Sequence, residues 1–207
     1  MPFMVRKIAD SAGAPYKVQI TMHALPSRSL EQHWNNSRVH ELIEAGWDRI
    51  VLQEKSGGHW DQQNRQNFSR YGRKLVDKAK SFAPQVSLLV GWPYSLAFFE
   101  GNEKHLKTHF DEMQKGHQVL SRETGAALIN VGAAWVRQLD RNPQLRLESD
   151  GNHPNVYGSF LAALAIYASL PDPRLSSVTY SPFGVAKPEA DELNASVERS
   201  LHFQGLR

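Results

Sequence analysis

Residues 150–163 read Asp150-Gly-Asn-His-Pro-Asn-Val-Tyr-Gly-Ser-Phe-Leu-Ala-Ala163, and they join a charged turn to an apolar helix. An acid three residues before a histidine can orient the imidazole and stabilise its protonated form, so Asp150 and His153 are candidate catalytic residues. Pro154 and Asn155 then open a helix that packs the turn onto the core. This arrangement is typical of the acid–base half of a serine hydrolase site. The alternative is structural: Asp150 caps the turn and His153 is merely exposed.

The rest of the chain alternates short β-rich runs with helical patterns, which is typical of a parallel sheet wrapped by helices. Strands are predicted at Lys17–His23, Asp48–Gln53, Val86–Val90 and Ala126–Val131. Helices are predicted over 3–12, 29–45 with Ser29 as N-cap, 61–82, 102–123, 133–139, the segment after His153, and 187–201. The second of these strands is apolar enough to lie inside the sheet.

The length and composition fit one soluble α/β domain spanning residues 1–207. The chain has 207 residues, of which 41% are apolar, and this is too short for two full domains. The net charge is +3 and basic residues are interleaved with acidic ones, so no nucleic-acid surface is expected. The absence of cysteine excludes disulfides, thiolate zinc sites and cysteine nucleophiles. No run approaches the ~18 apolar residues of a membrane span, and the first residues do not resemble a signal peptide.

The start of the chain is unusual for this class of fold. A doubly wound sheet normally begins with a strand that becomes central, whereas this sequence begins with a helical pattern. Without that strand the predicted sheet would expose two unpaired inner edges, which natural proteins avoid. We therefore expect the first strand to lie upstream of Met1, which would make residues 1–207 an N-terminally truncated domain.

Gln53 ends a predicted strand, at the edge of the sheet where α/β sites collect. Its carboxamide could donate a hydrogen bond to an oxyanion, and the alternative is an amide that satisfies the loop backbone. Ser56 in the following loop is expected to cap the loop or line a pocket, and is a weaker candidate for the nucleophile. His59 and Trp60 are expected at the rim of the cleft.

The other histidines do not predict a metal centre. His105 and His109 are four residues apart, a spacing that can hold a metal on a helix. They stand among lysines and lack the H-E-x-x-H pattern, so we expect an exposed helix face. His117 falls on an apolar stripe and is expected in the core. Glycine-rich phosphate loops are absent, and no cofactor is predicted.

Three blocks of the sequence resemble those of SGNH (GDSL-type) hydrolases, more closely an esterase-like branch, over nearly the whole chain. They are Ile50-Val-Leu-Gln-Glu-Lys-Ser56, Val131-Gly-Ala-Ala-Trp135 and, as the most specific, the Asp-x-x-His-Pro block that begins at Asp150. The resemblance implies a three-layer α/β/α flavodoxin-like fold and an esterase with a Ser–His–Asp mechanism and no cofactor. The substrate would be an ester with its acyl group on a sugar or a small alcohol.

By this resemblance His153 would be the general base, Asp150 its orienting acid and Gln53 an oxyanion donor. Residues 26–30 fall near the family's second block, where a glycine usually offers a backbone N–H. No glycine stands there, so a backbone N–H near Ser27 would have to serve. The pocket-lining residues would be Ser56, Trp60 and Trp92.

The family's first block is not visible in this chain. Its serine follows the first strand in a Gly-Asp-Ser or Gly-Asn-Ser turn, whereas Met1–Ala9 resembles the helix after that turn. The early serines do not follow a strand at a glycine-flanked turn: Ser11, Ser27, Ser29 and Ser37. We therefore expect the nucleophile upstream of Met1 and the 207-residue chain to be inactive alone. A signal peptide could also precede Met1, so no compartment is predicted. The alternative is a non-catalytic or carbohydrate-binding relative that keeps Trp34, Trp60 and Trp92.

Overall fold

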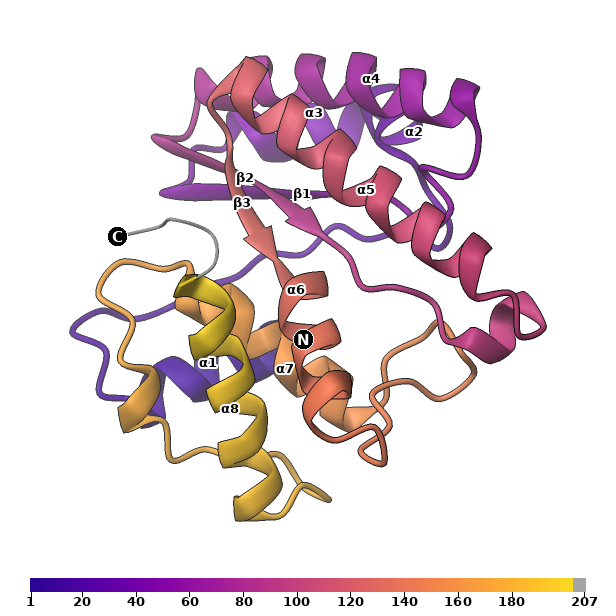
Figure 1. The fold of residues 1–207 in the computed structure, drawn as a ribbon. Helices are drawn as coiled ribbons and strands as arrows, with labels where there is room; N and C mark the ends of the chain where they lie inside the picture. Colours follow the sequence, from indigo (N-terminus) through magenta and orange to yellow (C-terminus); the bar gives the residue numbers. More distant parts are fainter. Residues whose placement is uncertain (203–207) are drawn as a thin grey trace. The chain divides into compact units, whose positions relative to one another are not determined.

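Three of the predicted β-rich runs form one parallel sheet in the computed structural model, which describes residues 1–202 (Figure 1). The strands are β1 (Arg49–Gln53), β2 (Gln85–Val90) and β3 (Ala127–Asn130), in the order β1-β2-β3. β1 and β2 run parallel, with Gln53 opposite Leu89. The middle strand β2 is buried over 86–90, whereas Val51 on β1 is 39% exposed. The sequence predicts β1 inside the sheet, but β1 lies at one end of the described sheet because no described strand pairs with its outer edge.

Residues from distant parts of the chain come together in two compact units. The first unit contains Met1–Met22, Trp92–Gly101 and the described residues from Asn130 onward. The second contains His23–Gly91 and Asn102–Ile129, and therefore almost the whole sheet. The single domain over residues 1–207 stays a prediction.

The α-helices of the second unit are α2 (Leu30–Trp34), α3 (Ser37–Glu44), α4 (Gln62–Lys80) and α5 (Glu103–Thr124). α4 contacts β1 and β2, and α5 contacts β2. α2 and α3 pack against α4. Phe68, Leu75 and Ala79 share the buried face of α4, as their spacing predicts. The helix predicted over 61–82 ends at Lys80, so Phe82 lies beyond it and is 39% exposed.

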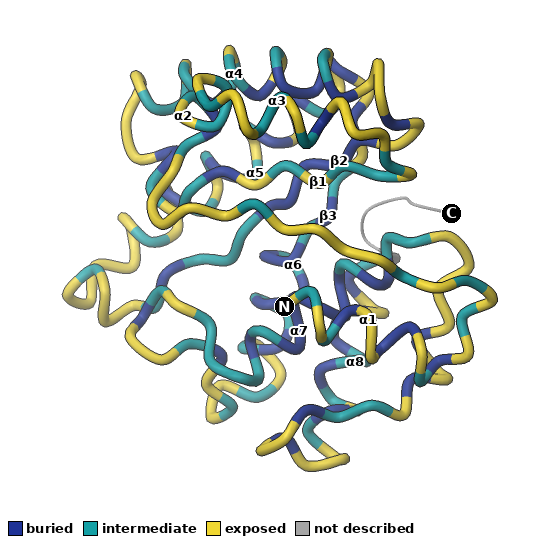
Figure 2. The backbone as a smooth tube through the Cα atoms, turned by 180° about the vertical axis from the view of Figure 1, so that it is seen from behind, coloured by how far each residue is buried: buried dark blue, intermediate teal, exposed yellow. Residues whose placement is uncertain are grey.

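The first unit is built around one apolar helix. Its α-helices are α1 (Pro2–Ser11), α6 (Val131–Arg141), α7 (Val156–Ala168) and α8 (Lys187–His202), and its 3-10 turns are Leu96–Phe99 and Leu175–Ser177. α7 is buried along most of its length and contacts α1, α6 and α8 (Figure 2). A helix that is apolar on every side is a core helix, and α7 holds this position in the first unit.

The strand predicted at Lys17–His23 is absent. This segment is irregular, and no strand within residues 1–202 pairs with it. Ile20 is 40% and Met22 is 64% exposed. β-rich composition favours a strand only where a neighbouring strand supplies hydrogen bonds, so the described sheet has three strands and not the expected four.

The single helix predicted over 29–45 is divided into α2 and α3. Ser29 is the N-cap of α2, as predicted, and forms a capping box with Gln32. Asn36 then caps α3 by accepting the N–H of Arg38 at 3.0 Å. Asparagine side chains compete with the helical hydrogen bonds of the backbone, which explains why the pattern breaks at this point.

Candidate active site

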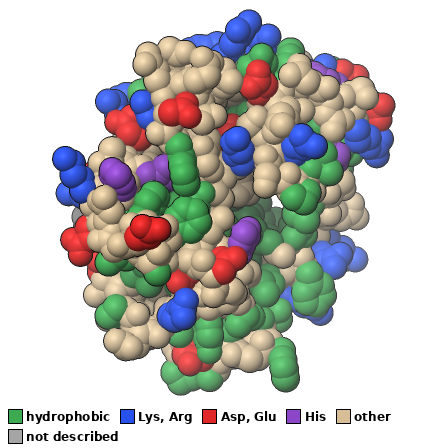
Figure 3. Space-filling view, turned by 90° about the vertical axis from the view of Figure 1, so that its right-hand side faces the viewer, with side chains coloured by type: hydrophobic (Ala, Val, Ile, Leu, Met, Phe, Trp, Pro, Cys, Tyr) green, Lys and Arg blue, Asp and Glu red, His purple; other side chains and the backbone are tan. Residues whose placement is uncertain are grey.

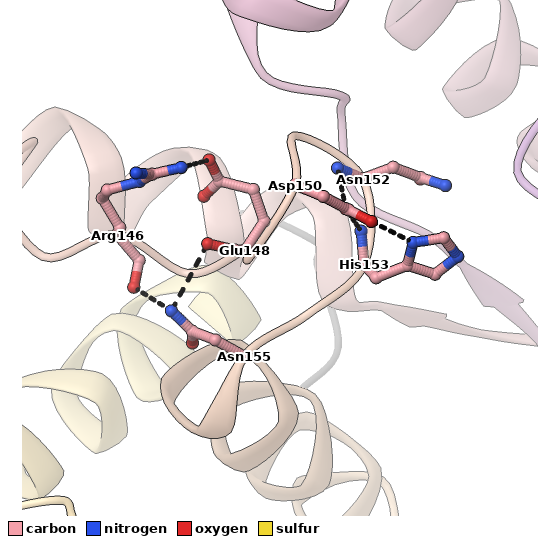
Figure 4. Close-up of polar contacts among 6 residues, drawn as sticks. All are labelled: Arg146, Glu148, Asp150, Asn152, His153 and Asn155. Atoms are coloured by element: carbon pink, nitrogen blue, oxygen red, sulfur yellow. Dashed lines mark hydrogen bonds and ion pairs between the residues drawn. The ribbon is translucent and has the colours of Figure 1, made fainter.

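The carboxylate of Asp150 holds both the ring and the backbone of His153 (Figure 4). Oδ2 lies 2.7 Å from His153 Nδ1, while Oδ1 accepts the His153 N–H at 2.8 Å and the Asn152 N–H at 3.1 Å. Because an ionised carboxylate only accepts hydrogen bonds, Nδ1 carries the proton of this contact. Nε2 is then the ring nitrogen that can take up a proton from another group. The two side chains singled out in the sequence are therefore in direct contact.

The same contacts keep Asp150 ionised. The pKa of its carboxyl group is lowered to about 2, first by the His153 backbone N–H, then by the His153 side chain and the Asn152 N–H. The side chain of Asp150 is 57% exposed and that of His153 is 75% exposed, so solvent screens their attraction. The contact therefore matters more for the orientation of the ring than for the stability of the fold.

Asn155 fixes this turn to the start of α7. Its Oδ1 accepts the N–H groups of Tyr157 at 2.9 Å and Gly158 at 3.1 Å, which makes it the N-cap. Its Nδ2 donates to the carbonyl oxygen of Arg146 at 2.8 Å (Figure 4). The Asn155 side chain thus links the buried helix to the segment that leads into the turn. These hydrogen bonds hold the turn in a fixed position against the start of α7.

Residues 92–95 brace the same turn through its carbonyl groups. Trp92 Nε1 donates to the Asn152 carbonyl oxygen at 2.8 Å, and the Ser95 N–H donates to the Gly151 carbonyl oxygen at 2.7 Å. Gly151 has a φ of +89°, and a Cβ there would lie 2.7 Å from Ser95 Oγ. The ring of Trp92 stacks on Trp135 at 5.0 Å between centroids. Sequence reasoning missed Ser95 and Gly151, for which the Asp-Gly turn pair was the one available signal.

The second unit holds the two predicted oxyanion donors. Gln53 is the last residue of β1 and is exposed. Ser27 has a φ of +57°, the left-handed conformation that glycine adopts most readily. It follows Pro26 in a turn in which the Arg28 N–H donates to the Leu25 carbonyl oxygen at 3.4 Å. Ser27 therefore occupies a backbone conformation that few residues other than glycine adopt readily.

A small polar cavity of about 150 Å³ lies at the end of β1. It is lined by Ser29, Glu31, Gln32, Glu54, Lys55, Gly58, Asn64, Asn67 and Phe68. Ser56 and Trp60, which the sequence predicts in a pocket, are not part of this lining. The side chain of Trp60 is 50% exposed. Glu54 is buried here, although its charge gave no reason to expect that from the sequence.

Three histidines are buried in the second unit: His59, His109 and His117. The His59 ring packs against the rings of Phe68 and His117, with centroids 4.4 and 5.1 Å away. The core position predicted for His117 is confirmed. The rim position of His59 and the exposed position of His109 are wrong, because the loop after β1 covers this face of α5. Trp60 in that loop packs edge-on against His109 at 5.8 Å.

Some kinds of site are not seen within residues 1–202. There, no group of three or more His, Cys, Asp or Glu side chains is placed to hold a metal ion. In the same residues, no helix has the length and apolar composition needed to cross a bilayer. On the face shown in Figure 3, Lys and Arg side chains are interspersed with Asp and Glu.

Comparisons with known proteins place the fold. The sequence matches no protein-family model and no curated protein sequence. A DUF4886 family protein from Bacteroides uniformis has a TM-score of 0.77 and 15% identity, over 97% of this chain and 88% of that chain. A candidate SGNH hydrolase from Slackia heliotrinireducens has a TM-score of 0.63 and 24% identity, over 80% and 88% of the two chains.

An acetylxylan esterase from Geobacillus stearothermophilus has a TM-score of 0.63 and 15% identity, over 86% of this chain and 80% of that chain. Its solved structures include catalytic mutants in which an aspartate or a serine is replaced by alanine. These likenesses extend over most of both chains while sequence identity stays low. The chain therefore adopts the α/β fold found in structures of SGNH hydrolases.

Proposed function

We propose that this protein is an SGNH-type ester hydrolase in which His153 is the general base and Asp150 its orienting acid. The observation that carries the proposal is the 2.7 Å contact between Asp150 Oδ2 and His153 Nδ1 in an exposed turn. The contact favours the tautomer with the proton on Nδ1, which leaves Nε2 as the nitrogen that accepts a proton. The likeness to acetylxylan esterase structures supports the same class of reaction.

The proposed chemistry is acyl transfer through a serine. The serine Oγ attacks the ester carbonyl carbon while His153 Nε2 takes the hydroxyl proton, and Asp150 stabilises the imidazolium ion. The oxyanion would accept hydrogen bonds from the Gln53 amide and the Ser27 N–H, each worth about 3 kcal/mol of transition-state stabilisation. The C–O bond then breaks, the leaving alkoxide takes the proton from His153, and water cleaves the acyl-enzyme by the same steps in reverse roles.

The nucleophile is proposed to be a serine upstream of Met1, and Ser56 is the alternative within the chain. Ser56 follows β1 and precedes Gly57, but the sequence favours it less. The proposed substrate is an ester of a small alcohol or a sugar. The acetylxylan esterases among the structural matches support an acyl group carried by a sugar.

The test combines hydrolysis of 4-nitrophenyl acetate with labelling by a fluorophosphonate. Both are measured on the 207-residue chain and on the same chain extended by any residues encoded in frame before Met1. We expect His153→Ala to lower kcat/KM of the active form by at least about 100-fold, because a positioned general base contributes that much or more. His105→Ala, on the exposed side of α5, is the matched control and should retain activity.

Each outcome of this test has one reading. Labelling of the longer chain alone supports an upstream serine, whereas labelling of the 207-residue chain that is lost in Ser56→Ala assigns the nucleophile to Ser56. An active protein that keeps its rate in His153→Ala contradicts the proposed base. Absence of labelling and hydrolysis in both forms favours the non-catalytic alternative. That alternative has less support in the structure, since Trp34 packs on His40 and Trp92 on Trp135.

A further inference from the structure

A buried carboxylate joins two segments of the second unit. Glu54 is 9% exposed, its Oε2 accepts the N–H of Leu30 at 3.1 Å, and its Oε1 accepts the N–H of Lys55 at 2.9 Å. We call these two hydrogen bonds the Glu54 clamp. A buried carboxylate is unfavourable unless its oxygens accept hydrogen bonds, and the clamp supplies one backbone N–H donor to each oxygen of Glu54.

The charged neighbours of Glu54 act in opposite directions. Burial is the main influence and raises the pKa of its carboxyl group, while the two N–H donors and the Lys55 ammonium lower it. Glu31 on α2 is the nearby like charge and raises it further. The residues that α4 contributes to the same cavity are uncharged: Asn64, Asn67 and Phe68. Protonation of Glu54 should therefore be visible as a single event above the usual range of glutamate.

The clamp connects the segments that carry the two proposed oxyanion donors. Glu54 directly follows Gln53 at the end of β1. Leu30 is the first residue of α2 and follows the turn that contains Ser27. Pro26 restricts the backbone of that turn, and the capping box of Ser29 fixes its exit. The hydrogen bond from Leu30 to Glu54 is thus a link between the turn and the strand end.

Gly58 leaves the space that the clamp needs. A Cβ at Gly58 would lie 2.2 Å from Cγ and 2.7 Å from Cδ of Glu54, so any side chain there must displace the carboxylate. At the neighbouring Gly57, a Cβ would meet only the indole of Trp60 at 3.6 Å, an ordinary contact. Neither glycine has a positive φ, so alanine at either position adds no strain of the backbone. The chain therefore offers a matched pair of substitutions.

We propose that Glu54 is a positioning residue that sets the distance between the Gln53 side chain and the Ser27 turn. The proposal rests on the proposed function for its catalytic consequence, whereas the clamp itself can be measured without substrate. Neither oxygen of Glu54 is expected to touch the ester. Its effect passes through Leu30 and the strand end.

The first experiment follows backbone amides by ¹⁵N NMR as the pH is lowered. In the wild-type chain we expect the Leu30 and Lys55 signals to move together at one midpoint above the usual range of glutamate. In Glu54→Gln and in Gly58→Ala this shared titration should disappear, and in Gly57→Ala it should remain. Glutamine offers one acceptor oxygen and presents N–H groups to the second donor, so it cannot make both hydrogen bonds. A Leu30 signal that does not titrate with Lys55 in the wild type overturns the proposal.

The second experiment measures ester hydrolysis by the same variants, made in whichever form of the protein is active. We expect kcat to fall by about 100-fold in Glu54→Gln and Gly58→Ala with little change in KM, because a misplacement near 1 Å has this effect on catalysis. Gly57→Ala should behave as the wild type. Equal kcat values in all of these proteins would overturn the positioning role. If neither the 207-residue chain nor its longer form hydrolyses an ester while the shared titration is present, the proposed function is refuted and the clamp remains.

Discussion

At the scale of single residues, the side chain of Asp150 fixes two parts of the same neighbour, the ring and the backbone of His153. Its two oxygens contact the ring and the backbone of His153 separately, so the imidazole cannot turn without losing one of them. Gly151 permits this geometry because it takes a φ of +89° in a space with no room for a Cβ. The turn is therefore specified by the conformations and hydrogen bonds of adjacent residues, which explains why it can be recognised in the sequence.

The titration of Asp150 tests this geometry directly. We expect its carboxyl group to titrate at about 2 in the wild type, against an ordinary value of 3.8. In His153→Ala the pKa should rise but stay below the ordinary value, because the backbone N–H groups of residues 152 and 153 still donate to it. The measurement is ¹³C NMR of the side-chain carboxyl against pH.

His105→Ala is the control for this titration and should leave the midpoint of Asp150 where it is. Because the folded-state pKa is lowered, the hydrogen bonds to the carboxylate persist above the ordinary value and are lost as the pH falls through about 2. An unchanged midpoint in His153→Ala would show that the ring does not contact Asp150 in solution.

At the scale of elements, α7 shows how a close contact fixes a helix against its neighbours. Gly158 in its first turn faces the Leu147 carbonyl oxygen and the Trp135 ring, at 2.1 and 2.6 Å from where a Cβ would be. Neither group can easily move, since one is backbone and the other is a fully buried ring. The Gly72 site in α4 differs, because its Cβ would meet the end of the flexible Leu120 side chain at 2.5 Å.

Alanine at these two glycines should therefore have different effects on stability. We expect Gly158→Ala to lower the free energy of unfolding by about 1–3 kcal/mol, the usual range for an overpacked site. We expect Gly72→Ala to change it by less than about 1 kcal/mol, since the gain in helix propensity offsets the shift of Leu120. Urea denaturation of the two variants and the wild type measures this, and equal losses would contradict the assignment.

The elements also show what sequence patterns can predict. Apolar spacing predicted α4, α5, α7 and α8 because each buries one face or all of its surface in contacts that repeat along the helix. The division at Asn36 and the irregular segment 17–23 were missed for different reasons. Asn36 acts through one side-chain hydrogen bond, and a strand depends on a partner that periodicity within the segment does not reveal.

At the scale of the whole molecule, the buried histidines should make stability depend on pH. Burial is the main cause that lowers the pKa of His59 to about 3 and of His117 to about 4, from 6.5. The His117, His109 and Arg65 charges also oppose protonation of His59, whose ring nitrogens have no hydrogen-bond partner within the described residues. Below pH 6.5 the unfolded chain therefore binds protons that the folded chain excludes. The contribution of the neutral buried histidines to the free energy of unfolding is therefore complete above pH 6.5 and is lost as the pH falls below it.

We expect the free energy of unfolding to fall by about 2 kcal/mol for each of His59 and His117 between pH 7 and pH 5. In His59→Leu the difference between the two pH values should shrink by about that amount, because one proton-binding group of the unfolded chain is gone. His105→Gln is exposed and should leave the difference as in the wild type. Urea denaturation at both pH values is the measurement, and an unchanged difference in His59→Leu would contradict the assignment.

The class of fold could be predicted from the sequence, whereas the arrangement into two units could not. Alternation of β-rich and helical patterns is a property of the sequence itself, and the structural matches confirm the α/β class. The division into units depends on contacts between residues far apart, such as those of Trp92 with Asn152 and Trp135. The burial of Glu54 and His59 depends on the path of one loop, and no local pattern encodes it.

The packing of Trp92 gives the protein a built-in optical reporter. Two indoles at 5.0 Å and 12° from parallel are expected to couple electronically and to give a distinct circular dichroism band. One of them is also bonded to the carbonyl between Asp150 and His153. A rearrangement of the acid–base pair should thus alter an intrinsic spectroscopic signal, which can be followed without a label, a substrate or a turnover.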